Sequence, residues 1–300
     1  MSGESLLVEY KIHHYRYDNF NSYEKVIRSA LNELGHLESD NPNVHIYNHC
    51  HKSELTTENN LIFKPTAPSA NYFAIDRIGY ASASELTFEE PNLPGFLQYT
   101  HLDNINNLIA SKSNKWDNSI LLKWRKPKNI PKDHILIIAQ MPDDESVTRH
   151  SFGDHIQKIK AIIEELKNEN VILKLHPRYK PTDKLRKFCK QYDIKIIEGY
   201  YSIHDILTNT KVAIVENSTA GIECLMHNVP VISYGWPEYH WATYKLKSLT
   251  QLRELVNNLD WYDELYAKDF IQWYINSYLC CDKHSTMRRL TELGYGKNKG

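Results

Sequence analysis

Two segments in the last third of the chain end in residues that could bind a phosphate. Each is an apolar, strand-like run, VILK in the first and KVAIV in the second. The polar and turn-forming residues at the ends of these runs are Lys174 and His176 in the first, and Asn217, Ser218, Thr219, Gly221 and Glu223 in the second. Because ligands of parallel α/β sheets bind beyond the carboxyl ends of the strands, we expect both groups to line one crevice. The second group also begins a helix, whose first N–H groups favour an anion. The sequence therefore predicts a nucleotide site.

Individual residues in these segments suggest separate tasks. The His176 imidazole could donate a hydrogen bond to a phosphate or to a departing nucleotide, and Pro177 fixes the path of the chain after it. A glycine at position 221 would let backbone and ligand approach closely. The Glu223 carboxylate could bind ribose hydroxyls, or it could simply complement the helix dipole.

A third strand-like run, HILIIAQ, ends in the polar loop MPDDESV. Gln140, Asp144 and Ser146 could line the same crevice from this strand. The alternative is a solvated acidic loop, since carboxylates beside a phosphate repel it unless they face a sugar or a cation.

The alternation of strand and helix patterns predicts two α/β halves. Residues 1–130 read as a first Rossmann-like, doubly wound domain and residues 131–265 as a second, more regular one. The proline- and lysine-rich stretch LLKWRKPKNIPKD reads as the link between them. Residues 266–300 read as a C-terminal helical segment that packs back on the first domain. Two such halves facing a cleft describe the GT-B architecture of glycosyltransferases, although many functions share such folds.

The chain resembles the capsule-polysaccharide glycosyltransferases that include the bacterial Kdo transferases. Three of its segments match that family: the Gln140–Ser146 loop, the Lys174–Pro177 tip and the turn from Ser218 to Glu223, which is followed by VPVISYG. The segment YFAIDRIGYASAS in the first half is similar to a family strand that ends in an acidic residue, here Asp76. The resemblance implies a GT-B enzyme that takes a nucleotide-activated sugar as co-substrate and passes the sugar to a surface polysaccharide. The family's Gly-Trp-Gly-like stretch is replaced here by Trp236–Trp241.

Sugar transfer needs a base for the acceptor hydroxyl and groups that stabilise the departing phosphate. Asp76, at the end of a strand that faces the expected cleft, is the first candidate for the base, and Asp18 is the second. Either carboxylate could instead be a helix cap or a surface charge. We expect inversion at the anomeric carbon. No strand end carries a DxD-like metal site, and His45, His49 and His51 lack a fourth ligand, so we predict no metal and no cofactor beyond the nucleotide-sugar.

Composition excludes several classes of protein. The net charge is −1 over 300 residues, which gives no overall case for a nucleic-acid or membrane partner. The five cysteines are scattered without a CxxC motif, as in a reducing compartment. The sequence shows neither a signal-peptide pattern nor an apolar run long enough to cross a bilayer. These features predict a cytoplasmic enzyme of a bacterium or of a phage-infected host cell.

Two alternatives to a polysaccharide acceptor remain open. A basic cluster at residues 123–132, together with several lysines and arginines between residues 178 and 187, could bind a polyanion, although a solvated surface explains it as well. A phage-type enzyme that glycosylates hydroxymethylated bases in DNA would use such a cluster and would have to flip its target base. The second alternative is a non-catalytic protein that binds a nucleotide or a sugar.

Overall fold

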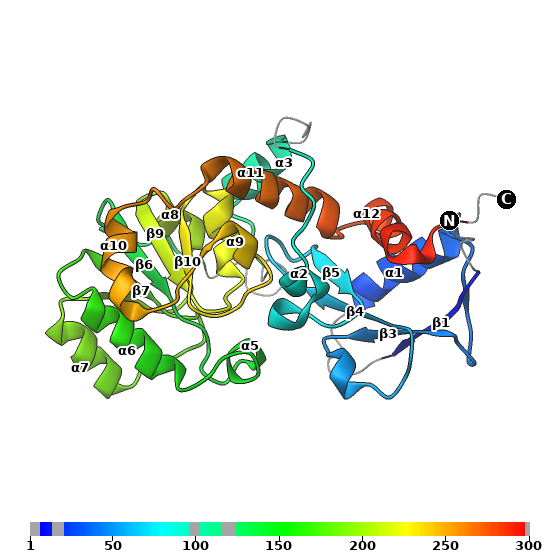
Figure 1. Cartoon of the computed structure of the whole chain (residues 1–300), viewed down its shortest axis with the longest axis horizontal. Coiled ribbons are helices and arrows are strands. Elements are labelled where there is room, and N and C mark those ends of the chain that lie inside the picture. Colours follow the sequence, from blue (N-terminus) through cyan, green and yellow to red (C-terminus); the bar gives the residue numbers. More distant parts are fainter. Residues whose placement is uncertain (1–6, 14–20, 96–101, 116–123, 298–300) are drawn as a thin grey trace.

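The computed structural model describes residues 7–13, 21–95, 102–115 and 124–297. Its strands form two separate sheets at opposite ends of an elongated molecule, and the helices α11 (Glu264–Trp273) and α12 (Lys283–Leu290) run between the two ends (Figure 1). This is the two-sheet α/β architecture that the sequence predicts, and the fold class GT-B is confirmed.

The N-terminal sheet has the strand order β2-β1-β3-β4-β5. Its strands are β1 (Glu9–His13), β2 (Leu37–Glu38), β3 (Val44–Asn48), β4 (Asn60–Pro65) and β5 (Phe73–Asp76), with the helices α1 (Asn21–Glu33) and α2 (Glu85–Phe88) in the same half. The helix α3 (Leu102–Ala110) lies beside α11, where Ile105 and Leu108 share a core with apolar residues of α11 (Figure 1). The sheet is parallel except for β5, which pairs antiparallel to β4. The regular strand–helix alternation expected here therefore breaks at β5, because only a short turn, and no crossover helix, connects it to β4.

The C-terminal sheet is parallel throughout, in the order β11-β10-β9-β6-β7-β8. Its strands are β6 (His134–Ile138), β7 (Val171–Lys174), β8 (Lys195–Ile197), β9 (Thr210–Val215), β10 (Val231–Ser233) and β11 (Tyr244–Lys245). The helices of this half are α5 (Glu145–Thr148), α6 (His155–Glu165), α7 (Asp183–Gln191), α8 (Ile203–Leu207), α9 (Ala220–Met226) and α10 (Leu252–Asn257). Strand order reverses between β6 and β9, which makes the gap beyond their carboxyl ends a topological switch point.

Local sequence explains why these elements form. Every residue of β6 is buried, as expected for a parallel strand covered by helices on both faces. Asp154 begins α6 by accepting the backbone N–H of Gln157, and Thr182 begins α7 by accepting that of Leu185. Apolar residues of α6, α7 and α10 cover one face of the sheet, and those of α8, α9 and α11 (Glu264–Trp273) cover the other.

The C-terminal segment returns to the N-terminal half. After α11 the chain forms a π-helical turn (Tyr274–Tyr278), and Cys280 then exchanges two backbone hydrogen bonds with Phe73 of β5. The helix α12 (Lys283–Leu290) packs on α1, and its Leu290 lies in the same apolar core as Tyr10 of β1. The expected crossing back is therefore present. The domain limits at residues 130 and 265 stay predictions.

The expected linker does not run freely between the halves. Arg125 forms a parallel bridge with Tyr201 beyond the end of β8, and its guanidinium lies over the ring of Tyr201. The ammonium group of Lys195 donates to the carbonyl oxygens of Lys128 and Asn129 at 3.0 and 2.6 Å. The segment from residue 125 to 129 therefore packs along the edge of the C-terminal sheet.

Candidate nucleotide-binding site

A pocket lies at the switch point of the C-terminal sheet. Its wall includes Ile138 and Ala139 at the end of β6, residues 174–177 at the end of β7 and residues 218–220 at the start of α9. The structure thus brings together the end of β7 and the turn after β9, as the sequence predicts. A crevice in this position is where parallel α/β sheets bind their ligands.

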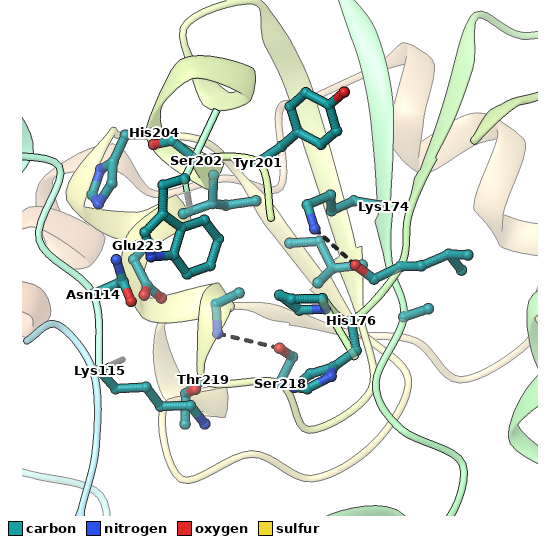
Figure 2. A pocket seen from close by; sticks show the side chains of 17 residues that line it. Asn114, Lys115, Lys174, His176, Tyr201, Ser202, His204, Ser218, Thr219 and Glu223 are labelled. Atoms are coloured by element: carbon teal, nitrogen blue, oxygen red, sulfur yellow. Dashed lines mark hydrogen bonds between the residues drawn. The ribbon is translucent and has the colours of Figure 1, made fainter. Parts of the chain in front are cut away.

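The two ends of the pocket differ in chemistry. In Figure 2, Asn114, Glu223, Ser202 and His204 gather at one end, and His176, Ser218, Thr219 and Lys115 surround the other. The first end offers hydrogen-bonding groups of both kinds. The second end offers a cation, an imidazole and two hydroxyl groups, which is a set suited to an anion.

His176 is held in one tautomer at the anionic end. Its Nδ1 accepts the backbone N–H of Arg178 at 3.3 Å, so the neutral ring carries its proton on Nε2. Burial, followed by the charges of Lys115 and Arg178, lowers the pKa of His176 to about 4. The ring is therefore neutral near pH 7 and can donate from Nε2.

Lys174 supports the pocket wall. Its ammonium group donates to the carbonyl oxygen of Leu175 at 2.7 Å and lies 3.4 Å from that of Gly199. Burial lowers its pKa to about 8. Lys174 therefore ties the end of β7 to the loop after β8, and both of these segments line the pocket.

The opposite end contains buried polar atoms. Ser202 is 8% exposed, and neither its Oγ nor the indole N–H of Trp124 has a hydrogen-bond partner among the described residues. Because buried polar groups in proteins are normally paired, such atoms in a pocket wall indicate a position that a ligand completes. Glu223, which is 5% exposed, adds a carboxylate beside them.

Four of the predicted donor-binding residues form a network behind the pocket. The Gln140 side chain accepts the Asn217 backbone N–H at 2.9 Å and donates to Ser146 Oγ at 2.8 Å. The Asn217 amide donates to the Ser146 carbonyl oxygen at 2.8 Å, and Asp144 accepts from Ser146 at the start of α5. These side chains tie the loop after β6 to the end of β9. Their direct contact with a donor stays a prediction.

Gly221 makes close contact with a side chain of the protein. A Cβ atom at this position would lie 2.2 Å from the hydroxyl oxygen of Tyr239 and 2.5 Å from its Cζ. The Tyr239 ring is 1% exposed, and its hydroxyl donates to the Ser218 carbonyl oxygen. The glycine makes room for this ring, a contact that the sequence argument did not foresee.

Asp76, the first candidate for the base, lies at the end of β5 and is 1% exposed. One carboxylate oxygen accepts the backbone N–H groups of Ile78 and Gly79 at 2.7 and 3.0 Å, and the other accepts that of Glu85 at 2.8 Å. Burial raises the pKa of Asp76, and these hydrogen bonds oppose the rise. The carboxylate therefore orders the turn before α2, and its catalytic role stays a prediction. Asp18, the second candidate, lies outside the described residues.

Two lysines, Lys64 and Lys115, lie close enough for their charges to interact. Lys64 of β4 holds its ammonium 3.5 Å from the ring centroid of Tyr80, and burial, followed by the charge of Lys115, lowers its pKa to about 7. Burial also lowers the pKa of Lys115, and the carboxylates of Asp144 and Glu223 oppose this shift. Lys64 therefore extends the cationic end of the pocket toward the N-terminal half.

Sequence reasoning missed several of these residues. Ser202 and His204 follow β8, a fourth strand end at the same edge of the sheet, so the argument used for the other three strands applies to it as well. Lys64 also stands near the end of a predicted strand. Trp124 reaches the pocket from the link between the halves, and Asn114 and Lys115 reach it from the segment after α3. Nothing in their local pattern indicates this.

The three histidines considered as metal ligands do not line one face of a strand. β3 ends at Asn48, and His49 follows with a positive φ of 48°, so His49 and His51 do not alternate along a strand. In the part of the chain that the structure describes, no group of three or more His, Cys, Asp or Glu side chains could hold a metal ion. No described helix is long and apolar enough to span a membrane.

Comparison with known proteins agrees with this architecture. The family described as capsule polysaccharide biosynthesis proteins matches residues 86–260, which is more than half of the chain. The chain belongs to this family, and the predicted resemblance is confirmed. No curated protein sequence matches the chain.

Two solved structures of KpsC from Thermosulfurimonas dismutans share the fold over nearly their whole length. The beta Kdo 2,4 transferase has 16% identity and a TM-score of 0.59, and the match covers 97% of this chain and 99% of that one. The beta Kdo 2,7 transferase has 16% identity and a TM-score of 0.55, with coverage of 95% and 99%. At this identity the likeness establishes a common fold.

Proposed function

We propose that the protein is a glycosyltransferase of polysaccharide biosynthesis that moves a sugar from a nucleotide-activated donor to a hydroxyl group of a saccharide. The observation that carries the proposal is the two-ended pocket at the switch point of the C-terminal sheet. The end of the pocket that contains Ser202 and Glu223 suits the nucleoside, and the end that contains Lys115 and His176 suits the phosphate. Membership in the capsule family and the fold shared with KpsC support the same class of reaction.

In this arrangement the residues of the phosphate end stabilise the leaving group. The bond from the anomeric carbon to the phosphate oxygen breaks as the acceptor oxygen attacks, and negative charge accumulates on the departing phosphate. The Lys115 ammonium and the Nε2–H of His176 would meet that charge. The acceptor hydroxyl must lose its proton to a base, for which Asp76 and Asp18 remain the predicted candidates.

The sugar itself is proposed to be acidic. Burial, followed by the charge of Lys115, lowers the pKa of Lys64, so these two ammonium groups lie near each other at the phosphate end of the pocket, where Asp144 and Glu223 also act on Lys115. A carboxylate on the transferred sugar would be attracted by the two cations. The Kdo transferases to which the chain is similar act on such a sugar, which supports the proposal.

The first test is transfer from a panel of nucleotide-activated sugars to oligosaccharide acceptors, detected by mass spectrometry. We expect product with an acidic sugar donor. We also expect Lys115→Ala to weaken nucleotide binding, as measured by the concentration dependence of Tm. Lys184→Ala, which removes an exposed cation on α7, is the matched control and should bind as the wild type does. Absence of transfer from every donor to a saccharide would refute the proposal and leave the DNA-modifying enzyme and the non-catalytic binding protein as the alternatives.

Two finer expectations can be checked with the same reaction. Product formed in the presence of EDTA would support chemistry without a metal, and the anomeric configuration of the product, read by NMR, would show whether transfer inverts. A parallel arm with hydroxymethylated duplex DNA tests the alternative acceptor. Binding to that DNA should fall steeply with salt if the basic cluster serves it, and salt-independent or absent binding would remove this option.

A further inference from the structure

Polar side chains from both halves meet where α5 faces the N-terminal half. The Arg149 guanidinium lies 2.6 Å from the Glu54 carboxylate, and the Tyr80 hydroxyl donates to Glu145. The Nε2 atom of His49 lies 3.6 Å from the same Glu145 carboxylate. We call this set the α5 contact. Figure 1 shows α5 on the side of the C-terminal sheet that faces the other half.

Two imidazoles lie at the centre of the α5 contact, one from each half. The ring of His51 stacks on Tyr80 with centroids 4.3 Å apart and meets the ring of His150 edge to face at 5.0 Å. Space for His51 depends on Gly79, where a Cβ atom would lie 2.5 Å from the His51 Nδ1. The two halves are thus fitted closely around this pair of rings.

Both imidazoles have buried ring nitrogens that make no hydrogen bond with the described residues. His51 is 6% exposed, and neither of its ring nitrogens has a partner among the described residues. The same holds for Nε2 of His150. Since an unpaired buried polar group is costly and uncommon, a purely structural contact would be better served by apolar rings. The presence of two titratable rings at this contact therefore points to a role besides packing.

We propose that the α5 contact is a proton-operated latch, which holds the two halves together over the cleft while His51 and His150 are neutral and releases α5 when these rings take up protons.

The charges around the two rings favour release on protonation. His51 faces Glu54 of its own segment, Lys64 of β4, and Arg149 and His150 from the far half. His150 faces Lys64, Arg149 and Glu145. Two cations therefore face each ring against a single carboxylate, and a proton on either ring would add to the positive charge already there.

The direction of the pH dependence follows from the burial of the rings. Burial, and then the charge of His150, lowers the pKa of His51 to about 4 in the closed contact, and burial lowers that of His150 as well. An exposed histidine has a pKa of about 6.5, so the open form binds protons more strongly. Closure is therefore favoured above about pH 6.5 and weakens as the pH falls. For His51 alone, the ratio of closed to open forms should drop roughly 30-fold between about pH 7.5 and about pH 5.

The latch would act on the donor pocket through one short segment. α5 follows the loop after β6, and that loop is bonded through Gln140 and Ser146 to Asn217, next to the pocket residue Ser218. Release of α5 would therefore widen the cleft and loosen one wall of the nucleotide site. This functional consequence rests on the proposed function, whereas the latch itself does not require sugar transfer.

Hydrogen–deuterium exchange of the full chain between about pH 7.5 and about pH 5, corrected for intrinsic rates, tests the latch directly. We expect protection of the amides in residues 145–150 and 51–54 to fall roughly 30-fold, with β6 and β9 unchanged. The variant His51→Phe/His150→Phe keeps two aromatic rings but cannot titrate, and its protection should change less than about threefold. His284→Gln, which removes an exposed histidine of α12, should behave as the wild type does.

Three results would overturn the proposal. These are protection of α5 that is independent of pH, a full pH response in the doubly substituted variant, and loss of protection in β6 and β9 together with α5, which is global unfolding. Failure to transfer any sugar while the latch responds to pH would refute the proposed function alone.

Discussion

Replacing Gly221 by alanine separates two explanations for this glycine. The added Cβ would lie 2.2 Å from the Tyr239 hydroxyl oxygen, 2.5 Å from Cζ and 2.6 Å from Cε2, well inside contact distance of a buried ring. Overpacking of this kind costs about 1–3 kcal/mol. Displacement of the ring also breaks the Tyr239–Ser218 hydrogen bond, which adds about 1 kcal/mol. We therefore expect Gly221→Ala to destabilise the fold by about 2–4 kcal/mol.

Thermal unfolding measures this effect. For a chain of this size each kcal/mol lowers Tm by roughly 2 °C, so the expected fall is roughly 4–8 °C. The decisive control is the same substitution in a Tyr239→Ala background, where the space is free. There Gly221→Ala should be neutral or should stabilise by up to about 1 kcal/mol, because alanine is the better helix former.

The alternative explanation gives the opposite pattern. If Gly221 is needed for the approach of a ligand, the single variant should keep its Tm and lose nucleotide binding. A destabilisation that persists without the Tyr239 ring would also refute the reasoning from the clash.

Two further substitutions test buried carboxylates. Asp76→Asn leaves an amide NH₂ facing backbone N–H donors, so we expect a loss of about 1–3 kcal/mol in a denaturant titration. If Asp76 is also the base, kcat per folded molecule should fall about 10²–10⁴-fold, and an unchanged kcat would end that prediction. Glu216 is fully buried and forms hydrogen bonds with His155, Lys158 and Ser151. Burial opposes the ionisation of Glu216, but these hydrogen bonds hold its pKa below the usual range. Glu216→Gln should cost about 3–5 kcal/mol at pH 7. In the wild type the ionised Glu216 contributes its full stability above about pH 4.3, and this stability is lost as the pH falls through the lower folded-state pKa. The stabilities of variant and wild type should therefore converge in acid. A stability difference that stays constant with pH would contradict the assignment.

The sequence predicts those parts of the site that depend on one strand and the turn after it. Runs such as that of β6 are long, apolar and followed by polar residues, so the position of each strand end is evident locally. Parallel pairing then places Lys174 and Ser218 at one edge without further information.

Features that depend on distant partners could not be predicted. Gly221 owes its role to Tyr239, which follows a further strand, and the burial of Asp76 depends on a C-terminal segment about two hundred residues away. β5 pairs antiparallel because of the path of the turn before it, which has no hydrophobic periodicity to reveal it. Trp124 reaches the pocket because the segment that follows it packs along the sheet edge, where Arg125 bridges Tyr201. Tertiary contact, rather than local preference, decides each of these cases.

The return of α12 to the N-terminal half has a consequence for how the protein matures during synthesis. Tyr10, Phe63 and Phe73 of the first sheet share their core with Cys280, Leu290 and Leu293. A ribosome makes this sheet early, yet these side chains stay partly uncovered until residues 280–293 have emerged. The C-terminal sheet, whose strands end at Lys245, has all its own strands before then. Although domains generally fold in the order of synthesis, the nascent chain should here complete its second half first and its first half last.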